Sequence, residues 1–170
     1  MNELFMLMIT TLSLAAFFSV AVVCVRKQSH GADPVFSNIA EGTHEDGLIT
    51  RTLDSAVTTK HLLGKQGDSA GDIDICGASE MPIGIITDEG DAGDNTAVQL
   101  LGCAGGTVKM VASGTIVAGE VVYTAAAGKV QDLPTDAGTY YHVGVAVTAA
   151  SDGEEFEAVP IQATASTTVS

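Results

Sequence analysis

Short runs rich in valine, isoleucine and threonine recur along the chain from residue 47 to residue 162, and glycine, aspartate, asparagine or proline closes each of them. The runs are GLITRTL, KHLLGKQG, DIDICG, MPIGIITDEG, TAVQLLG, GTVKMVAS, EVVYTAAAGKV, YYHVGVAVTAA and EFEAVPIQA. A spacing of about 8 to 12 residues between such runs is typical of an all-β sandwich or barrel. We therefore predict a small β-sandwich or β-barrel built of short hairpins, and only DSAVTTKHLL is compatible with a short helix.

The segment GTIVAGEVVYTAAAGKV, from Gly114 to Val130, contains clear hairpin signals. We expect a turn at Gly119, a strand over residues 121–123 and a reversal over residues 126–128. Gly119 and Gly128 would supply backbone conformations with positive φ that a β-branched residue resists. Because their small tips let another surface approach closely, both glycines are candidate interface positions.

An uncharged apolar run, LFMLMITTLSLAAFFSVAVVCV, extends from Leu4 to Val25. As a helix rising about 1.5 Å per residue it would span a bilayer, which indicates a membrane or signal segment. The preceding charge is Glu3, and Arg26-Lys27 follow the run, so the positive-inside rule would keep the rest of the chain on the cytoplasmic side. The other interpretation is an apolar arm buried against protein in an assembly, with four candidate interface residues: Leu4, Phe5, Phe17 and Phe18.

These patterns divide the chain into an apolar N-terminal segment at 1–27, a linker or extended arm at 28–46, a β domain at 47–162 and a polar tail at 163–170. The linker mixes glycine, proline, asparagine, serine and charged residues without a clear period. The tail, ATASTTVS, is small and polar, so we expect it to be either mobile or an extended edge.

Charge and composition narrow the classes of function. The 21 acidic and 7 basic residues give a formal net charge of −14, which argues against nucleic acid, because Lys and Arg provide most of the affinity for phosphate backbones. Such a charge suits a basic partner or high density on an outer surface, although a solvated acidic surface without a partner is equally compatible with it. Aromatic residues make up only 5% of the chain, so the aromatics that hold sugars in many sites are scarce.

Acidic residues provide two candidate sites. Asp88, Asp91 and Asp94 lie three apart in TDEGDAGDN, whereas a calcium loop alternates its ligands at every second position and ends on a bidentate acid. We therefore expect an ordinary Asp/Gly-rich turn and no metal. Asp72 and Asp74 alternate with isoleucines, as on an amphipathic strand, and nothing in the sequence fixes their separation as a catalytic pair.

Other catalytic signals are weak. The four histidines, at positions 30, 44, 61 and 142, form no HExxH motif, and neither GxSxG nor a phosphate-binding glycine loop occurs. Cys24, Cys76 and Cys103 show no zinc spacing. We expect buried thiols, with a Cys76–Cys103 bridge as the alternative that sequence cannot test. We predict no enzyme and no cofactor.

Tyr140 and Tyr141 are adjacent in a predicted strand. Alternation would place one ring in the core and the other outside, where it is either an interface anchor or a tyrosine at a strand edge with its hydroxyl in water.

An ordered set of segments carries a family resemblance: HLLGKQG, CGASEMPIGIITDE, VQLLG, GTIVAGEVVYTAAAGKVQDLP and GTYYHVGVAVTAA. With these segments the region from about Lys60 to Ile161 resembles phage capsid cement (decoration) proteins. The resemblance implies a compact β domain without catalysis that binds the outside of an assembled head, commonly as trimers, and reinforces the joints between major capsid subunits. The apolar N-terminal run matches no motif of that family.

We therefore expect a structural virion protein on the outer surface of a phage capsid, whose partners are the major capsid protein and further copies of itself, as a homotrimer. The alternative is a membrane-anchored or exported β domain that serves as an adhesion or scaffold module, with Leu4 to Val25 as its anchor.

Overall fold

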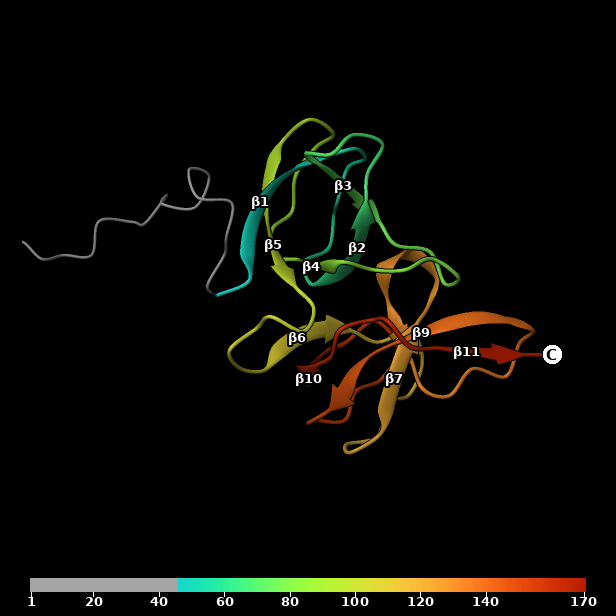
Figure 1. The fold of residues 1–170 in the computed structure, drawn as a ribbon. Helices are drawn as coiled ribbons and strands as arrows, with labels where there is room; N and C mark the ends of the chain where they lie inside the picture. Colours follow the sequence, from blue (N-terminus) through green and yellow to red (C-terminus); the bar gives the residue numbers. More distant parts are fainter. Residues whose placement is uncertain (1–45) are drawn as a thin grey trace, which may run out of the picture. The chain divides into compact units, whose positions relative to one another are not determined.

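Residues 46–170, which the computed structural model describes, contain eleven strands and one 3-10 turn (Figure 1). The first five strands form a closed barrel: β1 (Leu48–Leu53), β2 (Leu62–Gln66), β3 (Asp72–Ile75), β4 (Gly84–Ile86) and β5 (Asn95–Leu100). β1 pairs in parallel with β3 and antiparallel with β5. The ring is completed by three antiparallel pairs: β2 with β3, β2 with β4, and β4 with β5.

The other six strands form a second sheet: β6 (Val108–Val111), β7 (Val121–Thr124), β8 (Val130–Gln131), β9 (Gly138–Ala146), β10 (Glu155–Pro160) and β11 (Ser166–Val169). The order is β6-β10-β9-β7-β8, and β11 pairs with the first residues of β9. The 3-10 turn η1 (Ala126–Gly128) lies between β7 and β8. An isolated bridge between Ala112 and Val130 brings the chain beyond β6 next to β8.

Alternation of side chains explains which face of each strand is buried. In β10, Phe156 and Ala158 are buried, while Glu155, Glu157 and Val159 between and beside them are exposed. Successive side chains of a strand point to opposite faces of the sheet, so this pattern covers one face and leaves the other open.

The barrel and the second sheet share their apolar interior. One core cluster is built mainly from the second sheet, and it also contains four residues of the barrel region: Leu63, Cys76, Ile85 and Leu101. Conversely, Val111 of β6 belongs to the cluster that fills the barrel. The N–H of Gly128 in η1 donates to the carbonyl of Cys76 at 2.7 Å, which adds a polar contact at the same junction. Residues 46–170 therefore pack as one β domain, whose two core clusters each contain residues of both sheets.

The all-β prediction is confirmed, and so are the strand and turns predicted for residues 114–130. β7, η1 and β8 occur in the expected order, and Gly119 and Gly128 have φ values of +90° and +71°. The prediction of a short helix in DSAVTTKHLL is wrong. Val57 in that segment is buried in the barrel, and its N–H and C=O both pair with Gly90, which leaves no helical hydrogen bonds for it to make.

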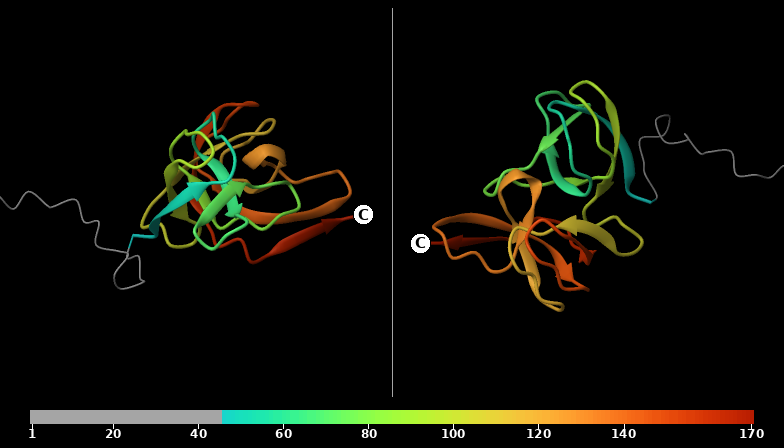
Figure 2. Two further views of the ribbon diagram at one scale, coloured as in Figure 1. Left: turned by 90° about the horizontal axis from the view of Figure 1, so that it is seen from above. Right: turned by 180° about the vertical axis from the view of Figure 1, so that it is seen from behind.

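The tail does not remain outside the sheet. Ala163 is buried in the core, and β11 runs antiparallel beside the start of β9, as the red and orange strands show in Figure 2. The tail is therefore an extended edge. The segment 1–27, the linker up to residue 45 and the candidates Leu4, Phe5, Phe17 and Phe18 lie outside the described residues.

Candidate functional site

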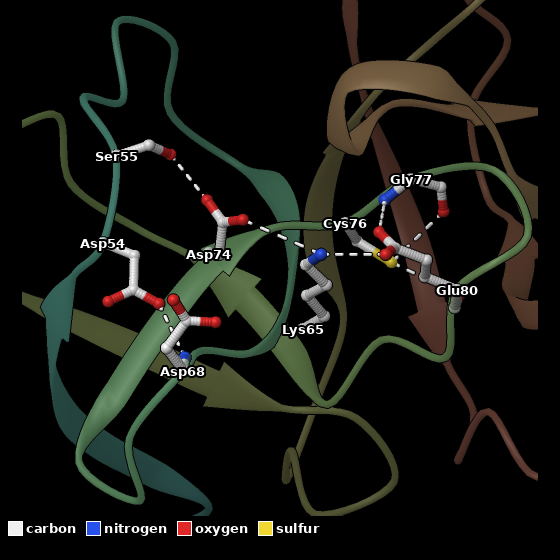
Figure 3. A network of polar contacts seen from close by, with 8 residues as sticks. All are labelled: Asp54, Ser55, Lys65, Asp68, Asp74, Cys76, Gly77 and Glu80. Atoms are coloured by element: carbon white, nitrogen blue, oxygen red, sulfur yellow. Dashed lines mark hydrogen bonds and ion pairs between the residues drawn. The ribbon is translucent and has the colours of Figure 1, made fainter.

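Lys65 lies at the centre of a polar network in the barrel (Figure 3). Its Nζ donates to Glu80 Oε1 at 2.8 Å and lies 3.7 Å from Asp74 Oδ2. Asp74 also accepts a hydrogen bond from the Ser55 hydroxyl at 2.6 Å, and Glu80 accepts one from the Gly77 N–H at 2.7 Å. Every charged group in this network has a partner, so it joins β2, β3 and the loop after β3 without presenting a free base or acid.

The hydrogen bond between Lys65 and Glu80 shifts the pKa values of both groups, in opposite directions. The hydrogen bond from Lys65, followed by that from Gly77, holds the pKa of Glu80 below its usual 4.5, and the hydrogen bond to Glu80 raises the pKa of Lys65. Both groups are therefore charged at neutral pH. An acid that stays ionised and an ammonium group that stays protonated are poorly suited to exchange protons with a substrate.

Cys76 is the one buried thiol beside this network. Its Sγ lies 3.3 Å from the carbonyl oxygen of Glu80 and 3.4 Å from that of Gly77. Burial raises its pKa to about 12. Since the thiolate is the nucleophilic form, this thiol is inert at neutral pH.

Cys103 is exposed, so the expectation of buried thiols is wrong for this residue. It lies on the exposed turn after β5, and both it and Cys76 are free, so the alternative of a bridge between them is also wrong. The two thiols are separated because β3 ends in the core whereas the turn after β5 faces solvent.

Thiol labelling tests this assignment. In a Cys24→Ser background at pH 8, we expect an aromatic disulfide reagent to modify Cys103 rapidly. Cys76 should react about a thousandfold more slowly, because its thiolate fraction is far smaller and it is shielded from the reagent. Adding Cys103→Ser should abolish the fast phase. Two equal fast phases in the Cys24→Ser chain would contradict the burial of Cys76.

The acidic loops use their carboxylates to hold turns. Asp94 Oδ2 accepts from the N–H of Asp91 at 2.9 Å, and Asp54 Oδ2 accepts from the N–H of Asp68 at 2.9 Å. Within residues 46–170, no group of three His, Cys, Asp or Glu side chains is placed to hold a metal ion. In the loop from Asp88 to Asp94, the N–H of Asp94 also donates to the carbonyl of Asp91 at 3.0 Å, which closes a turn.

Asp72 and Asp74 lie on one side of β3, opposite the fully buried Ile73, as the alternation predicts. Asp74 is engaged with Ser55 and Lys65. Asp74 is therefore held by these two contacts and is not a free carboxylate.

Glu155 connects the second sheet to the barrel region through hydrogen bonds. It accepts a hydrogen bond from Lys109 Nζ at 3.0 Å, and its other oxygen lies 2.8 Å from His61 Nδ1 on the loop before β2. The hydrogen bonds with Lys109 and His61, in that order of strength, hold the pKa of Glu155 below 4.5. The second described histidine, His142, contacts the Thr167 hydroxyl through Nε2 at 2.9 Å and meets Tyr123 edge-on.

Acid should weaken the fold through Glu80 and Glu155. Both pKa values are lower in the folded chain than the usual 4.5, so their stabilising contribution is present above that pH and is lost as pH falls through the folded values. We expect the free energy of unfolding, measured with urea from pH 7 to pH 3, to fall below about pH 4.5. The double variant Glu80→Gln, Glu155→Gln should show a flatter acid limb than Glu89→Gln, which alters an exposed loop position. Identical acid limbs would contradict this role.

The predicted interface residues of the second sheet differ in accessibility. Tyr140 is buried, and its hydroxyl donates to the carbonyl of Asp136 at 3.2 Å. Tyr141 is partly buried and packs against the core cluster built mainly from the second sheet. Gly128 is buried against β2, whereas no atom lies within 4 Å of a Cβ added to Gly119. Of these four candidates, Gly119 is the most open to a partner.

Sequence reasoning missed an apolar surface on β7, β9 and β10. Val121 is paired with Val145, and Val145 with Val159, so the three side chains form a row across three strands. Only the register of the strands places these three valines together, because it pairs residues that are far apart in the chain. We call this surface, together with Val147, the valine face.

No helix within residues 46–170 has the length and apolar character needed to cross a bilayer. The membrane alternative depended on Leu4 to Val25, which lies outside the described residues.

Comparison with known proteins finds a family model and solved structures to which the chain is similar. The family model described as "Phage cement protein" matches residues 47–161. The crystal structure of the N base of head fiber gp8.5 of bacteriophage phi29 is similar with a TM-score of 0.51 and 22% sequence identity, over 68% of this chain and 94% of that chain. At this identity the structural likeness supports the fold alone. A search of curated proteins found no match.

Proposed function

Because the chain belongs to the phage cement protein family, whose members are structural and not enzymatic proteins of the phage head, we propose that it binds the outer surface of assembled heads and stabilises the joints between major capsid subunits. The observation that carries the proposal is the extent of the family match. Residues 47–161 cover nearly all of the β domain, from β1 through β10.

The construction of the β domain suits such a role. A closed barrel leaves no free strand edges, and a core shared with the second sheet limits movement between the two. A rigid block loses little conformational freedom when it binds, so more of the contact energy remains as affinity. The engaged Lys65 network and the protonated Cys76 fit a protein that contributes shape and surface.

Interface area is the proposed mechanism. A standard protein interface buries about 1,600 Å² in total, and many copies repeat this contribution over the shell. Association of the copies as homotrimers would add avidity, because one bound subunit holds the others close to their own binding sites.

Heads assembled without the protein provide the direct test. We expect the purified full chain to bind them saturably, to be located on the outer surface by electron cryo-microscopy, and to raise the temperature at which the heads release DNA to a dye. Heads that already carry the protein are the matched control, since their sites are filled and added chain should neither bind nor stabilise them.

Three results would overturn the proposal. They are failure to bind, density on the inner surface, and binding without any change in the release temperature. Recovery of the chain with host membrane and its absence from purified particles would favour the membrane-anchored module instead.

A further inference from the structure

His61 has an unusual backbone conformation at the end of the loop before β2. Its φ is +63°, in the left-handed region that residues other than glycine rarely adopt. Holding a residue with a Cβ there costs free energy, so such a conformation persists only where surrounding contacts fix it. Two contacts do so here: the N–H of His61 donates to the carbonyl of Ile86 at 2.8 Å, and Nδ1 lies 2.8 Å from Glu155 Oε1.

Glu155 lies between two nitrogen groups that come from different parts of the domain. Lys109 Nζ, on β6, donates to Oε2 at 3.0 Å, and the His61 imidazole contacts Oε1. An ionised carboxylate accepts hydrogen bonds on both oxygens, whereas one oxygen of a protonated carboxyl group is a donor. Lysine and a protonated histidine can only donate. In acid, a protonated Glu155 therefore cannot accept from both neighbours on separate oxygens.

The charged surroundings of Glu155 are simple. Within residues 46–170, Lys109 on β6 and His61 on the loop are the charged groups that act on it. Glu157, the next residue on the same side of β10, accepts a hydrogen bond from the Thr107 hydroxyl, and Lys60, beside His61, is exposed. Loss of the negative charge of Glu155 thus leaves two cations directed at the same carboxyl group.

The loop that ends at His61 is short and exposed. Residues 58–60 are exposed, whereas Val57 before them is buried and pairs with Gly90, and Leu62 after them is buried in β2. Exposed segments with few buried contacts open locally at a lower free energy than the core strands beside them. This segment can therefore move away from β10 while the anchors on both sides of it stay in place.

We propose that Glu155 is an acid-sensitive latch, which holds residues 58–61 against β6 and β10 while it is ionised and lets this segment open when it takes up a proton. Both sheets stay folded during this opening. Since Lys109 and His61 hold the pKa of Glu155 below 4.5, the latch is closed at neutral pH and opens as pH falls through the lowered value. The inference does not depend on the proposed function, because every group of the latch belongs to one chain.

Hydrogen exchange of the full chain at about pH 6, followed by mass spectrometry of peptides, tests the latch. Glu155→Gln resembles the protonated residue, because its amide keeps one acceptor and adds a donor. In the peptide that covers residues 58–62, we expect the protected amides, which include the N–H of His61, to exchange about threefold to tenfold faster than in the wild type. Peptides from β5 and β9 should not change. The wild type should show the same local increase at about pH 3.5, after correction for the intrinsic effect of pH on exchange.

Two further variants make the test specific. Glu157→Gln is the matched control, since it makes the same chemical change on the same side of β10, and it should exchange like the wild type. His61→Gly removes the imidazole and adopts a positive φ without strain. In that background, Glu155→Gln should alter exchange by less than about twofold.

Four results would overturn the latch. They are unchanged exchange in Glu155→Gln, an equal effect of Glu157→Gln, an undiminished effect of Glu155→Gln in the His61→Gly background, and a uniform increase in all peptides. The last result would show a loss of global stability instead of local opening.

Discussion

Replacing Leu63 by alanine should lower the free energy of unfolding of the β domain by about 3 to 5 kcal/mol. Leu63 is fully buried on β2, and it belongs to the core cluster that the barrel shares with the second sheet. The substitution removes apolar contacts and leaves a cavity that has walls from both sheets. Neither sheet can close that cavity without disturbing its own strand pairs, so the loss should lie in the upper part of the range for leucine.

Leu133→Ala is the control for Leu63→Ala because it makes the same chemical change at a side chain that is 63% exposed. We expect urea unfolding of this variant to remain within about 0.5 kcal/mol of the wild type. A single cooperative transition in the wild type is expected as well, since both sheets contribute to one core. If Leu63→Ala produced two separate transitions, or had no larger effect than Leu133→Ala, the shared core would be contradicted.

Local signals predicted the strands well. The alternation of aspartate and isoleucine in DIDIC predicted an amphipathic strand, and β3 places Asp72 and Asp74 opposite the buried Ile73. Glycines in the 114–130 segment predicted its turns because positive φ is a property of the local backbone. Both features depend on neighbours in sequence, which is the information that a single chain provides.

The closure of the barrel could not be predicted in this way. It depends on pairing β1 with β5 and, in parallel, with β3, and strands that are distant in sequence meet only when the whole core forms. The same reason explains the error at Val57, whose segment looks compatible with a helix until Gly90 offers hydrogen bonds to its backbone.

The valine face shows the same limit of prediction from sequence. Val121 and Val159 are unremarkable in sequence, because each is one apolar residue in a strand that already has a buried face. Only the register of β7 and β10 on either side of β9 places them in one row with Val145. Tyr140 was a candidate interface residue because it is aromatic, but it is buried in the core.

Gly128 has a second role that its sequence context did not reveal. Its φ of +71° was expected from the turn, but a Cβ added there would also lie 2.9 Å from Leu62 Cβ and 2.9 Å from the carbonyl oxygen of Leu63. Real Cβ atoms do not approach other atoms so closely, and a backbone carbonyl in a barrel strand cannot move aside without breaking its pairing. Alanine at this position should therefore force η1 away from β2.

We expect Gly128→Ala to lower the free energy of unfolding by about 2 to 5 kcal/mol, of which about 1 to 2 comes from the left-handed backbone and the remainder from overpacking. Gly119→Ala separates the two contributions, because Gly119 has a φ of +90° and no atom within 4 Å of an added Cβ. It should lose only the backbone part, about 1 to 2 kcal/mol. Urea unfolding of the two variants measures the difference directly. If the two alanines cost the same, the close contact between η1 and β2 contributes nothing, and the glycine at position 128 is required by its turn alone.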